Sequence, residues 1–298
     1  MPGKILKWSA IILGGLLGLL VLAAAALYFL GSARRNKKFD VPVETVAVPA
    51  DAQAVERGRH IANVFLCTRC HTDNLGGELF YDIPGMLSIP TPNLTSGAGG
   101  VGAFYSDQDW VRAIRHGVGY DGRALFIMES EAFYYLSNED LGALIAFLKS
   151  VPPVDNTFPE RKIALPGRLM MGAGMLPPLP ANQIDHSAPR PTPPAPGMTI
   201  AYGEYLSHTC TECHGANLNG APFGPPGQEV PTPNLTPGGE PGSWSEEDFF
   251  KTMRTGITPN GRQLNGDMPW MYFGQMTHDE LSAVWMYLQS RPAMSQGG

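Results

Sequence analysis

A five-residue pattern, Cys-x-x-Cys-His, occurs twice in this chain, as Cys67–His71 and as Cys210–His214. The two copies use all four cysteines of the 298-residue sequence. This spacing is the attachment signature of c-type haem, in which both thiols form thioethers with the porphyrin and the histidine ligates the iron. The pattern therefore predicts two covalently bound haems c. The predicted thioether residues are Cys67, Cys70, Cys210 and Cys213, and the predicted proximal iron ligands are His71 and His214.

Two other kinds of site use paired cysteines, namely a thiol-redox pair and a zinc site. A four-cysteine zinc site would have to join two pairs that lie far apart in the sequence, in segments that look like separate repeats. It would also leave His71 and His214 without a role, so haem attachment is the stronger interpretation.

The N-terminal segment contains a run of 23 residues without a charge, from Trp8 to Leu30. As a helix this run would be about 35 Å long, which is enough to cross a bilayer. A cleaved signal peptide usually has a shorter apolar core of about 7–15 residues, although the alanines at 23–26 would suit a cleavage site. We therefore predict one transmembrane helix in an uncleaved membrane anchor, residues 1–38.

The orientation of this anchor follows from the haem chemistry. Four basic residues follow the apolar run, so the positive-inside rule alone slightly favours a cytoplasmic C-terminal side. Covalent haem attachment, however, takes place outside the bacterial cytoplasmic membrane. The haem-bearing part of the chain is therefore expected on the periplasmic side of that membrane.

The charge of the chain is unevenly distributed. Residues 51–153 hold 12 acidic and 7 basic side chains, and residues 198–298 hold 10 and 4. Two acidic regions argue against a nucleic-acid partner and favour docking to a redox protein with a basic patch. Ordinary solvated acidic surface is the alternative for any single carboxylate.

An internal repeat surrounds the two haem patterns. The sequence Pro-Thr-Pro-Asn-Leu-Thr occurs at 90–95 and again at 231–236. Helix-start signals follow at Ser106 and Ser245, each with an aspartate three residues later. Each repeat ends with a further capped segment, at 137–150 and 277–290, that carries apolar residues along one helical face.

Each repeat also begins with a helical segment that leads into its haem pattern. These segments, residues 54–66 and 198–209, each contain one glycine, Gly58 or Gly203. Because glycine has no side chain, a second helix is expected to approach closely at these two positions.

These elements predict an all-α fold with two small haem domains, residues 54–153 and 198–298. A short tether, residues 39–53, precedes the first domain. A linker with ten prolines, residues 154–197, separates the two domains and is expected to be semi-extended. Its apolar patch, Leu169–Leu176, could rest on a haem domain, on a partner or on the membrane, and we favour packing on a haem domain. Pro189–Pro196 is expected to adopt a stiff polyproline conformation.

The sixth iron ligand decides between electron transfer and catalysis. Met268 precedes a proline and the closing helix of the second repeat, and Met128 aligns with it after a one-residue gap. Both are predicted as axial ligands, although the proline is missing after Met128. Met86 and His116 are the rival ligands in the first domain.

Two pairs of arginines recur at equivalent positions of the repeats. A buried propionate of the haem is one possible partner for these cations, and a surface salt bridge is the other. The two interpretations have equal weight. The residues are Arg115, Arg123, Arg254 and Arg262.

The order of these motifs resembles that of bacterial class I cytochromes c. It is most similar to the multihaem cytochrome subunits of membrane-bound alcohol, aldehyde and gluconate dehydrogenases. Pro90–Thr95, Pro231–Thr236 and the Met268-Pro269-Trp270 segment carry the resemblance. It implies two tandem class I cytochrome c domains, with His/Met ligation and electron transfer from a periplasmic donor. Those subunits usually carry three haems, whereas this chain has two patterns.

The leading hypothesis is a membrane-anchored dihaem carrier that passes single electrons between a dehydrogenase or respiratory complex and a downstream acceptor. The alternative is a peroxidase-like dihaem enzyme with an open sixth site on the first haem. Whether Met128 ligates the iron of the first haem distinguishes the two hypotheses.

Overall fold

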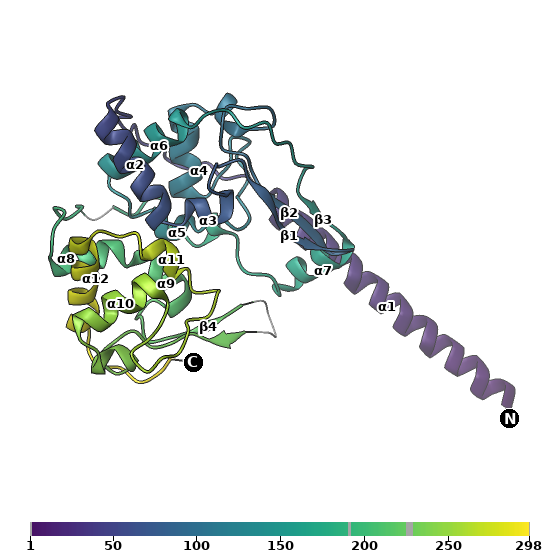
Figure 1. Ribbon diagram of the computed structural model, residues 1–298. Coiled ribbons are helices and arrows are strands. Elements are labelled where there is room, and N and C mark those ends of the chain that lie inside the picture. The colour runs from purple at the N-terminus through teal and green to yellow at the C-terminus, as the bar shows by residue number, and fades with distance from the viewer. Residues whose placement is uncertain (1, 190–191, 225–228, 298) are drawn as a thin grey trace.

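A computed structural model describes residues 2–189, 192–224 and 229–297 of the chain. A single long helix, α1 (Pro2–Asn36), projects away from two helical domains that lie against each other (Figure 1). The helix is long and apolar enough to cross a membrane, and its apolar stretch is not buried in the protein. The expectation of a mostly helical fold behind an apolar N-terminal helix is confirmed.

The first domain combines short helices with a pair of strands. The Cys-x-x-Cys-His pattern itself forms a short helix directly after the first domain helix. The elements are α2 (Ala52–Val64), α3 (Cys67–His71), β1 (Glu78–Ile83), β2 (Leu87–Thr91), η1 (Val101–Ala103), α4 (Asp107–His116), α5 (Ser130–Phe133) and α6 (Asn138–Ser150).

The second domain repeats this order with shorter strands. The elements are α8 (Ile200–Leu206), α9 (His208–His214), β4 (Pro222–Phe223), β5 (Val230–Pro231), η3 (Glu240–Ser243), α10 (Glu246–Thr255), α11 (Trp270–Phe273) and α12 (His278–Ser290). The strands pair as β1-β2-β3 and β4-β5, with β3 (Lys162–Ile163) supplied by the linker. These small sheets are additions to the expected helical fold.

The predicted helix starts are present as capping boxes. The side chains of Ser106 and Ser245 each accept a hydrogen bond from the backbone three residues later, and the aspartates there bond back. Each box satisfies two backbone donors that the first helical turn would leave unpaired. Both helices end at a left-handed glycine, Gly117 or Gly256.

The first and last helices of each domain cross at a glycine. A Cβ at Gly58 would overlap the carbonyl oxygen of Ala143, and one at Gly203 would overlap that of Ala283. Glycine at these positions lets α2 approach α6 and α8 approach α12 backbone to backbone. The expectation that these glycines bring a second helix close is therefore confirmed.

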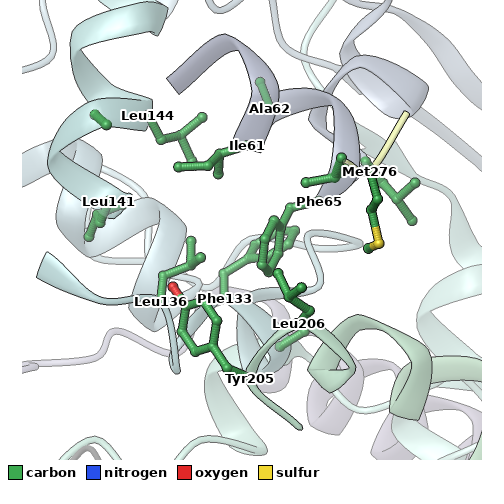
Figure 2. Close-up of a cluster of buried hydrophobic side chains, with 14 of the residues drawn as sticks. Ile61, Ala62, Phe65, Phe133, Leu136, Leu141, Leu144, Tyr205, Leu206 and Met276 are labelled. Carbon is green, nitrogen blue, oxygen red and sulfur yellow. The ribbon is translucent and has the colours of Figure 1, made fainter. Parts of the chain in front are cut away.

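The two domains share one hydrophobic core. In Figure 2, Phe65 of the first domain lies near Tyr205 and Leu206 of the second, and Ile61 and Leu144 continue the same cluster into the first domain. All five side chains are less than a tenth exposed. Burial of apolar surface across this boundary holds the domains together as one body.

Two carboxylates complete the domain interface, and they occupy the same position in the two closing helices. Asp140 accepts hydrogen bonds from Arg57 of its own domain and from the hydroxyl of Tyr205, both at 2.6 Å. Glu280 accepts from His60 Nε2 of the other domain at 2.8 Å. With Gly58 aligned on Gly203, His60 and Tyr205 are also equivalent, so the interface has an approximate two-fold symmetry.

The linker is more structured than expected. Residues 165–173 form a helix, α7 (Leu165–Ala173), and residues 180–182 a 3₁₀ turn, η2 (Pro180–Asn182). The prediction that the apolar patch Leu169–Leu176 packs on a haem domain is wrong, because α7 packs along α1. Gly31 and Gly172 allow this close crossing, which the sequence pattern did not reveal. The polyproline prediction for Pro189–Pro196 falls partly outside the described residues.

Candidate functional site

The two Cys-x-x-Cys-His helices carry free thiols that face the shared core. None of the four cysteines forms a disulfide, and Cys67 and Cys210 pack against the buried apolar cluster. Burial raises the pKa of Cys67 to about 12 and that of Cys210 to about 11, so both thiols are protonated at neutral pH. Partly buried, unpaired thiols beside an apolar core suit thioether formation better than a solvent-exposed redox pair.

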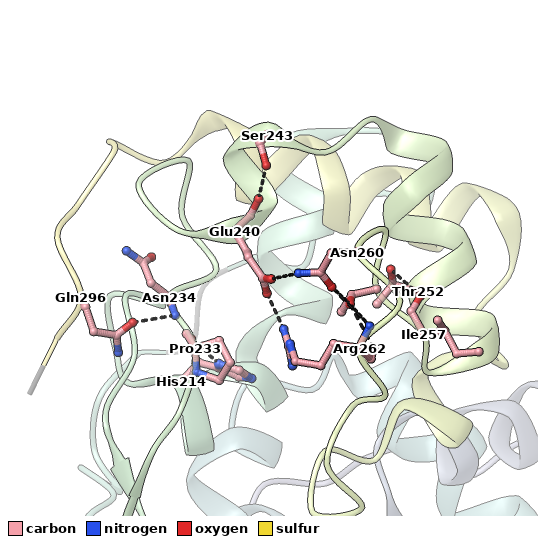
Figure 3. Close-up of polar contacts among 11 residues, drawn as sticks. His214, Pro233, Asn234, Glu240, Ser243, Thr252, Ile257, Asn260, Arg262 and Gln296 are labelled. Carbon is pink, nitrogen blue, oxygen red and sulfur yellow. Dashed lines mark hydrogen bonds and ion pairs between the residues drawn. The ribbon is translucent and has the colours of Figure 1, made fainter.

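Both proximal histidines are held by the same backbone contact. His71 Nδ1 donates to the carbonyl oxygen of Pro92 at 2.9 Å, and His214 Nδ1 donates to that of Pro233 at 2.8 Å (Figure 3). A carbonyl only accepts, so the proton sits on Nδ1 and the lone pair of Nε2 is available to a metal. Burial lowers the pKa of both imidazoles, which favours this neutral form.

The threonine of each Pro-Thr-Pro-Asn segment fixes the end of the attachment helix. Thr91 Oγ1 donates to the carbonyl oxygen of Cys70 at 2.7 Å, and Thr232 Oγ1 donates to that of Cys213 at 2.8 Å. These carbonyls have no partner within so short a helix, and the threonines supply one. The segment thus supports both the histidine and the helix that carries it.

The asparagine of the same segment ties the site to the end of each domain. Asn93 Nδ2 donates to the carbonyl of Val154 at 2.6 Å, and Asn234 Nδ2 donates to that of Met294 at 2.7 Å. Both acceptors lie just beyond the closing helix. The repeated sequence therefore has a structural explanation at its threonine, proline and asparagine positions.

The two candidate methionines lie in matching backbone. Met128 O accepts from Ser130 N and Met268 O accepts from Trp270 N, both at 2.8 Å, directly before α5 and α11. Glu129 has φ −76° and ψ 54°, and Pro269 has φ −81° and ψ 49°. Glu129 therefore keeps the conformation that a proline imposes at this point. Both methionine side chains pack against the same core as the cysteines.

The rival ligands lie elsewhere. Met86 is in the turn between β1 and β2, where its carbonyl accepts from Ala164 N of the linker at 2.8 Å. His116 is buried at the end of α4, with Nδ1 3.0 Å from His186 Nδ1. Their positions support Met128 as the candidate on the first domain.

The comparison with known protein families agrees with this geometry. The family model for cytochrome c matches the chain twice, over residues 55–152 and 200–292. The chain belongs to the cytochrome c family. Each domain of this cytochrome carries one attachment pattern, so the protein binds two haems c.

The similar proteins are cytochrome subunits of dehydrogenases. The fructose dehydrogenase cytochrome subunit of Gluconobacter japonicus is 29% identical over 284 residues, covering 86% of this chain and 56% of the relative. The cytochrome c subunit of the quinone alcohol dehydrogenase of Gluconobacter oxydans is 28% identical, covering 84% and 57%. The gluconate 2-dehydrogenase cytochrome c subunit of Pantoea cypripedii is 26% identical, covering 82% and 62%. The chain thus spans a little over half the length of these relatives.

The first pair of repeated arginines supports the closing helices of the cytochrome domains. Arg115 is fully buried, donates from Nη2 to the carbonyl of Leu136 at 2.6 Å and pairs with Glu44. Arg254 Nη2 donates to the carbonyl of Met276 at 2.7 Å. Leu136 and Met276 each directly precede the N-cap of a closing helix, so these roles are equivalent. Glu44 belongs to the predicted tether, which therefore lies on the first domain.

The second pair forms short-range ion pairs. Arg123 Nε donates to Asp121 at 2.6 Å, and Arg262 pairs with Glu240, which also accepts from Asn260 (Figure 3). These contacts agree with the interpretation of Arg123 and Arg262 as members of surface salt bridges. Contacts of the four arginines with haem propionates stay a prediction.

One candidate contact was missed at the sequence level. The indole Nε1 of Trp110 is buried and has no hydrogen-bond partner among the described residues. A buried donor without a protein partner is suited to contact an acceptor oxygen of a bound group such as haem. The equivalent residue in the second domain is Phe249, which has no donor. A tryptophan on the buried face of a helix is typical of core packing, so the sequence offered no separate signal.

Proposed function

We propose that this protein is a membrane-anchored dihaem electron carrier that serves as a subunit of a dehydrogenase or respiratory complex. Its α1 helix anchors it in the bacterial cytoplasmic membrane, and the two cytochrome domains lie on the periplasmic side. When bound, each haem supplies a one-electron ferric/ferrous couple. The chain itself supplies the attachment thiols, the axial ligands and the docking surface.

The matching backbone around Met128 and Met268 is the observation that carries this proposal. A closed sixth position favours electron transfer, whereas a peroxidase needs an open or displaceable one. Because Glu129 has nearly the same φ and ψ as Pro269, the missing proline gives no reason to treat the first site as open. Met128 and Met268 are therefore proposed as equivalent axial ligands.

The domain interface supports intramolecular transfer. Arg69, within the first attachment pattern, donates from Nη2 to the carbonyl of Asp267 next to Met268, at 3.3 Å. Burial and the nearby Glu129 raise the pKa of both Cys70 and Cys213, and Arg69 opposes this rise at both thiols. Glu129 and Arg69 of the first domain therefore influence one attachment cysteine in each domain. The two attachment sites therefore face a common boundary.

The relatives support the proposed partner class. Their names identify cytochrome subunits of fructose, alcohol and gluconate dehydrogenases. The proposed donor for this chain is accordingly a periplasmic dehydrogenase subunit, and the proposed acceptor is a membrane quinone or a terminal oxidase. Residues 51–153 and 198–298, which contain the two cytochrome domains, carry net charges of −5 and −6, which suits docking of a partner with a basic patch.

A spectroscopic redox titration tests the proposal on the wild type and on Met128→Ala and Met268→Ala. We expect two low-spin haems in the wild type and loss of the methionine–iron absorption from one haem in each variant. The potential of the affected haem should fall, because the thioether stabilises ferrous iron. The control pair Met86→Ala and Met271→Ala should leave both potentials unchanged.

The peroxidase alternative predicts a different result. A first haem that is high-spin in the wild type and that binds cyanide or peroxide readily would contradict the carrier. In that case Met128→Ala would change neither the spectrum nor the potential, while Met268→Ala would still remove one methionine band.

A further inference from the structure

The C-terminal end of α1 is surrounded by elements of the linker and the first domain. Figure 1 shows α7 and strands β1, β2 and β3 gathered at this point. Arg168 of α7 donates from Nη1 to the hydroxyl of Tyr28 at 2.9 Å, and its guanidinium lies over the same ring. A Cβ at Gly172 would overlap the carbonyl oxygen of Leu27. The helix α7 is therefore fixed beside the last turns of the uncharged run.

This region has an unusually basic character. We call residues 31–40 and 160–176 the basic collar. The collar contains seven basic and two acidic side chains, whereas both cytochrome domains are acidic. The basic residues are Arg34, Arg35, Lys37, Lys38, Arg161, Lys162 and Arg168.

Arg161 of the collar is influenced by two other cations, Arg35 of the collar and Arg123 of the first domain, and Arg123 is paired with Asp121. Burial and the neighbouring charges of Arg35 and Arg123 lower the pKa of Arg161, and Asp121 only partly offsets this. The Nε of Arg35 is buried and has no hydrogen-bond partner in the described part of the chain. Cations that repel one another in this way would be stabilised by an anion near their exposed side.

Apolar side chains lie exposed next to these charges. Leu165 at the start of α7 and Met175 just beyond its end are 58% and 54% exposed. On the edge strand β1, Leu79, Tyr81 and Ile83 alternate along the chain and are each nearly half exposed. The hairpin is joined to the collar, since Ala164 N donates to the carbonyl oxygen of the β1–β2 turn at 2.8 Å.

We propose that the basic collar docks onto the anionic phospholipid headgroups around α1, with α7 lying in the membrane interface. This inference rests on the proposed membrane anchor. Arginine and lysine side chains would contact the phosphates, while Leu165 and Met175 would enter the boundary between headgroups and acyl chains. Interfacial helices combine apolar and basic side chains in this way.

Continuity with α1 identifies lipid as the occupant of this surface. Leu30 is the last residue of the predicted span, and Arg34, the first charged residue after it, follows one helical turn later, about 6 Å along the axis. The collar therefore starts where the bilayer core would end. A protein partner that recognises the acidic cytochrome domains would have the wrong charge for this surface.

Thiol accessibility in lipid nanodiscs tests the docking, using the full-length holoprotein. The native cysteines are consumed by haem attachment, so an introduced cysteine is the reactive one. The variants are Leu165→Cys and Met175→Cys, with Ile257→Cys on the second domain as the aqueous control and Leu17→Cys as the anchor control. Each is treated with a neutral polyethylene-glycol maleimide, which does not enter the bilayer. The modification rate is followed by mass spectrometry in phosphatidylglycerol and in phosphatidylcholine discs.

We expect Leu165→Cys and Met175→Cys to react several-fold more slowly in phosphatidylglycerol discs than in phosphatidylcholine discs. Ile257→Cys should react equally fast in both, and Leu17→Cys should stay unreactive. Equal rates in both lipids for the two collar variants, with Leu17→Cys still protected, would overturn the docking and leave the anchor intact. Reaction of Leu17→Cys would overturn the anchor and the docking together, while the redox titration would still test electron transfer.

Discussion

At the scale of single residues, the Pro-Thr-Pro-Asn-Leu-Thr segment supplies a contact from almost every polar position. Its second proline accepts from the histidine, its first threonine bonds to the attachment helix, and its asparagine reaches the chain beyond the closing helix. A buried group that loses its partner costs about 1–3 kcal/mol, so these positions tolerate little change.

Thr232→Val should destabilise the second domain by about 1–3 kcal/mol, because the hydroxyl bonded to the carbonyl of Cys213 is replaced by a methyl group of similar size. The free energy of unfolding is measured by guanidinium titration of the holoprotein, followed at the haem absorption band. Thr255→Val is the matched control, because Thr255 is exposed on α10. Equal stability of the two variants would refute the supporting role of Thr232.

Substitution of Arg115 should destabilise the protein more than most substitutions outside the attachment patterns. Arg115→Gln removes the ion pair with Glu44 and the bond to the carbonyl of Leu136. Loss of one member of a fully buried ion pair typically costs about 3–5 kcal/mol, and because Glu44 is 29% exposed we expect a smaller loss of about 2–3 kcal/mol. Thermal unfolding measures the effect, and Arg262→Gln, whose ion pair is about half exposed, is the control that should change little.

At the scale of elements, helix crossings decide the shape of each domain. The pairs α2/α6 and α8/α12 approach closely because Gly58 and Gly203 carry no side chain. The same close packing of a glycine against a backbone carbonyl recurs where α7 crosses α1, at Gly31 and Gly172. In each case a backbone carbonyl occupies the space of a Cβ, and backbone moves less easily than a side chain.

Gly203→Ala should therefore destabilise the second domain by about 1–3 kcal/mol, the usual cost of overpacking. The added methyl group overlaps the carbonyl of Ala283, so α8 and α12 have to separate. Calorimetry of the holoprotein measures the change. Gly14→Ala is the control, because a Cβ there meets no atom within 4 Å and alanine favours a helix. A stabilised Gly203→Ala variant would contradict the close crossing.

At the scale of the whole molecule, the two domains form one body through an approximately symmetric interface. The closing-helix carboxylates Asp140 and Glu280 each bond to a side chain of the other domain. Apolar residues of both domains fill the space between them. A fixed interface holds the two domains, and with them the two attachment patterns, in one relative arrangement.

This interface should weaken in acid. Burial raises the pKa of Glu280, but hydrogen bonds from His60 and from the cap of α12 outweigh it and hold the pKa below its ordinary value of 4.5. A carboxyl with a depressed pKa in the folded state stabilises the fold at neutral pH, and this contribution is lost as the pH falls through the folded pKa. Wild type should therefore lose stability below about pH 4.5 relative to Glu280→Gln.

The test is a pair of denaturation series across the acid range. At pH 7 Glu280→Gln should be less stable than the wild type by about 1–3 kcal/mol, and the difference should disappear in acid. The control is Asp279→Asn, which removes an exposed carboxylate from the same helix. A difference that stays constant with pH would show that the charge of Glu280 does not hold the interface.

The local features of this protein follow from short stretches of its sequence. The attachment patterns, the helix caps at Ser106 and Ser245 and the apolar N-terminal run are all set by neighbouring residues, so their positions could be predicted from spacing alone. The repeat also predicted a close helix approach at Gly58 and Gly203. The axial role of Met128 and Met268 follows from the alignment of the repeats and stays a prediction.

Which distant segments meet depends on the three-dimensional packing of the chain. The linker patch packs on α1 rather than on a haem domain, and His60 and Tyr205 bond across the domain boundary. Such contacts depend on the close approach of backbones at glycines and on complementary side chains far apart in the chain. Periodicity reports which face of a helix is apolar, but it does not report which surface covers that face.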